Sequence, residues 1–340
     1  MIKRCITYVL VLFSILIFSS VFYSLNRAWT HSVISTIPIG NSPRGIVYDS
    51  GNKEMYVSNS GSNTISVIDT SNHTVVATIT VESFPIGVAY DQDNQKIYVA
   101  NDGSNTVSVI NTSNHRIEDE VPVGSRPNGL AYDPDNKKMY VANDGSNTVS
   151  VINTSNHTVV ATITVGSHPN GLAYDPDNKK MYVTNAGSNT VSVINTSNNI
   201  LNTTITVGFV PLGVAYDARN KAIYVSDSAE NLVSVINTSN NTVSTTITLE
   251  HPPQGIVHNS RNNDIYVTNS AVNTVSVINT SSNKVVDIIP VGMGPVSIAY
   301  DPVNGEVYIT NQDDNTVSVI TTLPVANANS NQKIQSFQTV

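Results

Sequence analysis

Histidine and aspartate recur along this 340-residue chain at a fixed spacing, and each type suggests a chemistry. His73, His115 and His157 are 42 residues apart and would suit a metal site if they converged. Pairs of aspartates one residue apart would suit calcium, namely Asp91/Asp93, Asp133/Asp135 and Asp175/Asp177. Whether such residues meet in space depends on the elements that carry them.

Several patterns that would support these chemistries are missing from the sequence. The aspartate pairs lack the Asp-x-Asp-x-Asp-Gly…Glu arrangement of a calcium loop, and His168 and His251 are not next to carboxylate clusters. No nucleophile elbow, P-loop or dinucleotide fingerprint occurs. Cys5 is the sole cysteine, which excludes a disulfide and a thiol nucleophile in the rest of the chain. We therefore expect turn-forming histidines and aspartates, no metal, no cofactor and no enzymatic activity.

The chain is built from repeats of 42 residues. The stretch YVANDGSNTVSVINTSNH occurs at residues 98–115 and again at 140–157. Seven copies follow one another without insertion, and each contributes one of Tyr56, Tyr98, Tyr140, Tyr182, Tyr224, Tyr266 and Tyr308 and one of Asn63, Asn105, Asn147, Asn189, Asn231, Asn273 and Asn315. Such a period indicates a solenoid, a propeller or another repeat array.

Each copy contains four short strand patterns. In the copy at 127–165 these are GLAYD (129–133), KMYVAN (138–143), TVSVIN (148–153) and TVVATITV (158–165). Asp-Pro-Asp-Asn and Asp-Gly sequences supply turns between them, and no segment has helical periodicity. Four antiparallel strands in about 40–45 residues are typical of a propeller blade. The sequence predicts an all-β, seven-bladed β-propeller.

The ends of the repeat array predict ring closure. Residues 32–40, SVISTIPIG, match the fourth strand of a copy, whereas the last copy stops after its third strand at 316–321. We expect the N-terminal strand 32–40 to pair beside 316–321 and complete the last blade, which leaves no open sheet end. The segment RIEDEVPV (116–123) fits an outermost strand, because charge and proline discourage edge-to-edge association.

The repeat resembles a known family. YVTN occurs at 182–185 and 266–269, with close variants in the other copies, and SNTVSVI and PxGLAYDPDN accompany it. Over residues 32–322 the chain is similar to the YVTN β-propeller repeats, including those of archaeal surface-layer proteins. The resemblance implies the fold and a cell-surface setting but no particular reaction. YVSD at 224–227 departs from the pattern, a change that we expect the blade to tolerate.

Potential glycosylation sites gather in one loop type. Nine Asn-x-Ser/Thr sequences lie at or beside the connection between the third and fourth strands, at Asn72, Asn111, Asn153, Asn156, Asn195, Asn202, Asn237, Asn240 and Asn279. Asparagine, serine and threonine are also good turn residues, so turn formation combined with duplication explains them too. In an up-and-down blade this loop shares a face with the first turn and leaves the opposite face free of sequons.

The sequon-free face carries the crossovers between blades. On either side of the crossover proline the residue type varies from copy to copy, as in Arg126, His168 and Leu212. Drift of exposed turn residues is one interpretation. The other is an interaction face around the channel mouth, with the candidates Phe84, Arg126, His168, Phe209 and Leu212.

The termini and the net charge indicate where the protein is located and which partners it can have. Lys3 and Arg4 precede twenty uncharged residues (6–25), which predicts that residues 1–30 are a signal peptide or a signal anchor and that the rest is exported. We expect one propeller domain over 31–322 and a polar, disordered tail over 323–340. The net charge of −8, or −10 without Lys3 and Arg4, argues against nucleic-acid binding.

These observations favour a non-enzymatic propeller, secreted or at the cell surface, with a structural, adhesive or protein-interaction role. The partners expected are other cell-surface proteins or saccharides, with membrane contact through the N-terminal segment if it is not cleaved. A surface-layer-associated role fits the resemblance. The alternative is a ligand-binding or lactonase-like hydrolytic propeller with a site at the central channel, although the inner strands vary little between copies.

Overall fold

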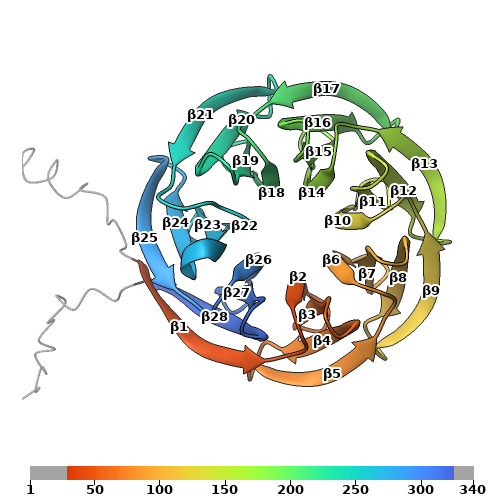
Figure 1. Cartoon of the computed structure of the whole chain (residues 1–340), viewed down its shortest axis with the longest axis horizontal. Helices are drawn as coiled ribbons and strands as arrows, with labels where there is room; N and C mark the ends of the chain where they lie inside the picture. The colour runs from red at the N-terminus through yellow and green to blue at the C-terminus, as the bar shows by residue number, and fades with distance from the viewer. Residues whose placement is uncertain (1–28, 325–340) are drawn as a thin grey trace, which may run out of the picture. The chain divides into compact units, whose positions relative to one another are not determined.

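A computed structural model describes residues 29–324 and shows a ring of seven four-stranded sheets (Figure 1). The predicted all-β seven-bladed propeller is confirmed. The hydrophobic segment 6–25 and nearly all of the predicted tail lie outside the described residues. Among residues 29–324 the single helical element is the three-residue turn η1 (Ser270–Val272), so no described helix could cross a bilayer.

Each blade runs from an inner to an outer strand. The first three blades are β2 (Pro43–Asp49), β3 (Glu54–Asn59), β4 (Thr64–Asp69), β5 (Thr74–Thr80); β6 (Pro85–Asp91), β7 (Lys96–Asn101), β8 (Thr106–Asn111), β9 (Arg116–Pro122); and β10 (Pro127–Asp133), β11 (Lys138–Asn143), β12 (Thr148–Asn153), β13 (Thr158–Thr164). The next three are β14 (Pro169–Asp175), β15 (Lys180–Asn185), β16 (Thr190–Asn195), β17 (Ile200–Thr206); β18 (Pro211–Asp217), β19 (Ala222–Asp227), β20 (Leu232–Asn237), β21 (Thr242–Thr248); and β22 (Ile256–Asn259), β23 (Asp264–Asn269), β24 (Thr274–Asn279), β25 (Lys284–Pro290).

Both ends of the described chain build the seventh blade. Its strands are β26 (Pro295–Asp301), β27 (Glu306–Asn311), β28 (Thr316–Pro324) and β1 (Trp29–Pro38), with β1 outermost beside β28. The backbone N–H of Ile39 also donates to the carbonyl of Asn315 over 3.0 Å, just as Val81 bonds Asn63 within the first blade. Closure by the N-terminal strand is therefore confirmed, and β9, with exposed Glu118 and Asp119, is an outer edge as predicted.

The core lies between neighbouring sheets. One cluster joins Tyr140 and Val151 of the third blade to Met181 and Ile194 of the fourth, and equivalent clusters occupy the other junctions. The seven repeated tyrosines are at most 1% exposed. A blade buries its apolar face only against the next blade, which is why the repeats are stable as a ring.

The inner strands approach one another very closely. A Cβ atom at Gly171 would lie 2.6 Å from the carbonyl oxygen of Leu212 in the next blade, and at Gly87 it would overlap the carbonyl oxygen of Asn128. Glycine occupies this position in six copies and Ser297 in the seventh, as expected for strands that converge on an axis.

A side-chain hydroxyl group bridges neighbouring inner strands through two hydrogen bonds, and we call this arrangement the hydroxyl bridge. Ser226 Oγ accepts a hydrogen bond from the Gly213 N–H (2.8 Å) and donates to the carbonyl of Gln254 in the next blade (2.5 Å). Serine or threonine makes the same bridge at Ser58, Thr184, Thr268 and Thr310. Ala100 and Ala142 occupy this position in the second and third blades and cannot form it.

Blade six departs from the repeat. Residues that precede the crossover proline, such as Phe84 and Val210, have a left-handed φ of 56° and 55°. Pro252 cannot adopt a positive φ, because its ring fixes φ near −65°. The inner strand β22 accordingly begins only at Ile256, and Gln254 N–H bonds the Thr268 carbonyl instead.

The aspartate of YVSD is accommodated, as expected, but it is buried. In the other copies an asparagine such as Asn185 donates through Nδ2 to the hydroxyls of the third strand. Asp227 instead accepts from Ser234 Oγ over 2.5 Å, and burial raises the pKa of Asp227 to about 6.

The hydroxyl bridges between inner strands lead to a first prediction. Ser226→Ala should lower the free energy of unfolding by about 1–2 kcal/mol, because it removes the partner of the Gly213 N–H and of the Gln254 carbonyl, both on half-buried residues. Ala142→Ser should raise it by about 1 kcal/mol by adding the missing bridge. Denaturant unfolding of both variants measures these changes. If Ser226→Ala left the free energy of unfolding unchanged while Ala142→Ser lowered it, the stabilising role of the hydroxyl bridge would be contradicted.

The second prediction concerns pH. Because the folded pKa of Asp227 lies above its usual value of 3.8, its contribution to stability is present below about pH 4 and is lost as pH rises through about 6. Asp227→Asn should therefore raise the free energy of unfolding by roughly 2 kcal/mol at pH 7.5 and change it little at pH 4. Asp313→Asn, which removes an exposed carboxylate, is the control. Equal gains for Asp227→Asn at both pH values would show that titration is not the cause.

Candidate functional site

The repeated asparagine positions the crossover in six of the seven copies; in the sixth blade Pro252 has no N–H to donate. Asn105 Oδ1 accepts from the Arg126 N–H (2.8 Å), and Asn147 Oδ1 accepts from the His168 N–H (2.9 Å). With the left-handed φ at Arg126 and His168, this bond turns the chain just before the proline. The residue before the proline thus reaches the rim of the ring, while the residue after it faces the axis.

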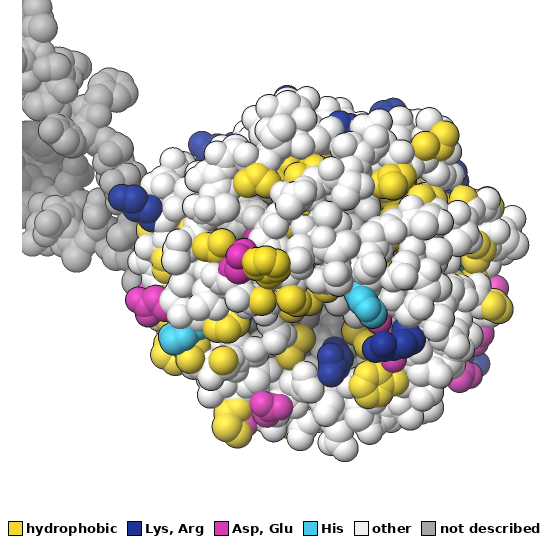
Figure 2. Space-filling view, turned by 45° about the horizontal axis from the view of Figure 1, so that its top comes forward, with side chains coloured by type: hydrophobic (Ala, Val, Ile, Leu, Met, Phe, Trp, Pro, Cys, Tyr) yellow, Lys and Arg dark blue, Asp and Glu magenta, His cyan; other side chains and the backbone are white. Residues whose placement is uncertain are grey.

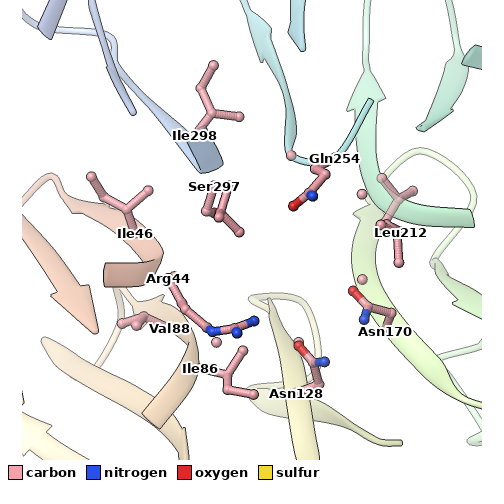
Figure 3. A pocket seen from close by; sticks show the side chains of 18 of the residues that line it. Arg44, Ile46, Ile86, Val88, Asn128, Asn170, Leu212, Gln254, Ser297 and Ile298 are labelled. Atoms are coloured by element: carbon pink, nitrogen blue, oxygen red, sulfur yellow. The ribbon is translucent and has the colours of Figure 1, made fainter. Parts of the chain in front are cut away.

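The residues that follow the crossover prolines line a cavity of about 310 Å³ on the axis. All seven blades contribute to its wall, and Figure 3 shows the side chains of Arg44, Asn128, Asn170 and Gln254 directed into it. Ile86 and Leu212 supply apolar wall beside these polar groups. This volume lies at the lower end of the range for small-molecule sites.

Arg44 is the one ionisable residue among the described residues that line the cavity. Its guanidinium carbon lies 5.6 Å from the centre of the Phe84 ring, a cation–π arrangement that holds the side chain at the mouth. Its Nε is buried and has no hydrogen-bond partner in the described part of the chain. Arg44 was not among the predicted interaction residues, although it is the one charged residue at this position of the repeat.

The predicted interaction residues divide between rim and wall. Phe84 and Phe209 are exposed at the rim (39% and 55%), whereas Leu212 lies in the cavity wall. Figure 2 shows a face whose centre is hollowed and whose rim carries hydrophobic and cationic side chains. The rim and the wall belong to one surface, because consecutive crossover residues form both.

Two aspartates that the sequence analysis missed organise the rim. Arg126 bridges Asp102 (Nε–Oδ2, 3.3 Å) and Asp144 (Nη1–Oδ2, 3.1 Å), and His168 Nδ1 lies 3.2 Å from Asp144 Oδ1. The sequence predicted no carboxylate cluster beside His168, and the structure places one aspartate, Asp144, against its imidazole. The turn between the second and third strands bends back against the crossover, as the Asp144 N–H to Arg126 carbonyl bond shows, and brings Asp144 to the imidazole.

The repeated histidines and aspartates have structural positions. His115 has a turn conformation with φ of 56° and lies edge-on to Tyr56 of the preceding blade, while Asp133 Oδ1 accepts the N–H of Asp135 within its turn. Among residues 29–324 no group of three or more metal-binding side chains gathers.

The sequons lie at the outer hairpins, and their asparagines form local turns. Asn153 and Asn195 are half-buried and accept the N–H two residues on, and the same turn occurs at the exposed Asn240. Asn202 is instead the third residue of strand β17 and is exposed. The described structure thus favours Asn72, Asn156, Asn202, Asn237 and Asn240 as the accessible acceptors.

Comparisons with known proteins identify a family and a fold. A family model described as "Choice-of-anchor I domain" matches residues 87–338, and no curated protein matches. Among 1538 matching chains of solved structures is Kuenenia stuttgartiensis hydrazine synthase, with a TM-score of 0.75 and 22% identity over 84% of this chain and 96% of that chain. At this identity the likeness shows the fold alone.

Proposed function

This chain belongs to the choice-of-anchor I domain family, and from that premise we propose that it is a non-enzymatic cell-surface propeller that serves as an interaction scaffold. The family description names an anchor, which supports a surface setting, and the YVTN resemblance adds a surface-layer-associated role to the proposal. Neither names a partner.

The observation that carries the proposal is the exposure of anchor residues on the crossover rim. Phe209 and Phe84 are large apolar side chains in water, and the Arg126 side chain is 59% exposed although two carboxylates hold it. Aromatic and arginine residues are the usual anchors of interfaces. The left-handed main chain at Phe84 and Arg126 is held by hydrogen bonds to Asn63 and Asn105, so binding would not have to order the backbone there.

The cavity supports binding better than hydrolysis. General acid–base catalysis needs groups that exchange protons near the working pH. Among the described residues that line the cavity there is no carboxylate, imidazole or amine, and the one ionisable residue is Arg44. We therefore assign the channel mouth to recognition.

The test of this proposal compares two sets of variants in attachment of the protein to its native cell surface. Replacing Phe84, Arg126 and Phe209 together by serine should reduce attachment about tenfold or more while lowering the melting temperature little, because these side chains hold little core. Replacing the exposed sequon residues Asn156 and Asn240 by glutamine should leave attachment intact.

Mass spectrometry of the same preparations reports whether sugar is present on those asparagines. Loss of attachment in the sequon variants, with normal attachment of the rim variant, would place the contact on the hairpin face and overturn the proposal.

A further inference from the structure

We propose that the axial cavity binds a small hydroxylated carboxylate, of the sugar-acid class, whose carboxylate is held by Arg44. The inference deepens the proposed function, on which it rests for the choice of face, by naming the chemistry that this face recognises.

The first step is the unpaired cation. Arg44 reaches the cavity from the start of β2 and keeps a buried Nε without a partner in the described chain, while Phe84 contacts it through a ring face. Arg44 is partly buried, and an Nε–H that leaves water without an acceptor is costly. A planar oxyanion would accept from the guanidinium donors in pairs. The chain as a whole is acidic, so a lone cation at this site is a specific feature.

The second step concerns the rest of the ligand. Asn128 and Asn170 project into the same cavity, and amides both donate to and accept from hydroxyl groups. Ile86 and Leu212 supply apolar wall on either side of the two amides, and Val296 lies between Gln254 and Arg44 in the order of the blades. A bare inorganic anion would accept from the amide N–H groups but would leave the amide carbonyls without a donor and the apolar wall in contact with water. A hydroxylated carbon ring with a carboxylate uses the cation, the amides and the apolar wall.

The third step is size. A cavity of about 310 Å³ corresponds to roughly ten water volumes and admits one small molecule, such as a monosaccharide. A polymer would have to enter through one residue at its end, which fits a site at the mouth of a channel.

The experiment is calorimetric titration of the full chain with D-galacturonate, with D-galactose and with inorganic phosphate. We expect galacturonate to bind about tenfold or more tightly than galactose, and Arg44→Gln to remove that difference. Arg44→Lys should bind with intermediate affinity, because it keeps the charge and loses the planar fork.

Arg219→Gln, which makes the same substitution at an exposed turn outside the cavity, should bind like the unaltered protein. Thermal melts of each variant separate lost binding from lost folding, and Arg44→Lys keeps the test valid if Arg44→Gln is unstable.

Three results would overturn the inference: no binding of galacturonate, equal binding of galactose, or phosphate binding as tight as galacturonate with the same dependence on Arg44. The last would identify a general anion site. The titration uses free ligand and no cells, so absence of binding would not contradict the attachment result. Conversely, loss of attachment in the rim variant would not show whether the cavity binds galacturonate.

Discussion

The distance between neighbouring inner strands is the constraint on which the rest of this propeller depends. Glycine at Gly87 and Gly171 lets the backbone of one blade reach the carbonyl of the next, and hydroxyls such as Ser226 Oγ bridge the same junction. Because these contacts repeat around the ring, the residue after each crossover proline must face the axis. The cavity is therefore a consequence of how the blades are joined, and its chemistry is set by one variable residue per blade.

This arrangement separates stability from recognition. The buried tyrosines and the repeated asparagines at Asn63 and its equivalents are the same in every copy, while the residues on either side of the crossover proline differ between blades. Substitutions at Phe84 or Arg44 alter the rim and the wall without touching the clusters between sheets. A repeat array that arose by duplication can in this way acquire an asymmetric surface while each blade keeps its core.

The sequence predicted the fold in detail because its signals are local and are repeated seven times. Strand bounds, turn positions and the closing strand β1 follow from alternation, turn residues and the point at which the last copy stops. The site was predicted less well. The contact of His168 with Asp144 joins a turn to a crossover 24 residues away. The feature that singles out Arg44 is a buried Nε for which the described residues supply no hydrogen-bond acceptor. Neither property can be read from one copy of the repeat.

The central claim is that this molecule binds its ligand at the end of the channel that the crossovers surround. Hydrogen–deuterium exchange of the full chain, with and without saturating D-galacturonate, tests it most directly, because bound ligand slows opening of the segments it contacts. The account predicts slower exchange in peptides that cover 43–46, 85–88 and 127–130, with unchanged exchange in the hairpins at 111–116 and 153–158. Slower exchange in the hairpins with unchanged crossovers would contradict it.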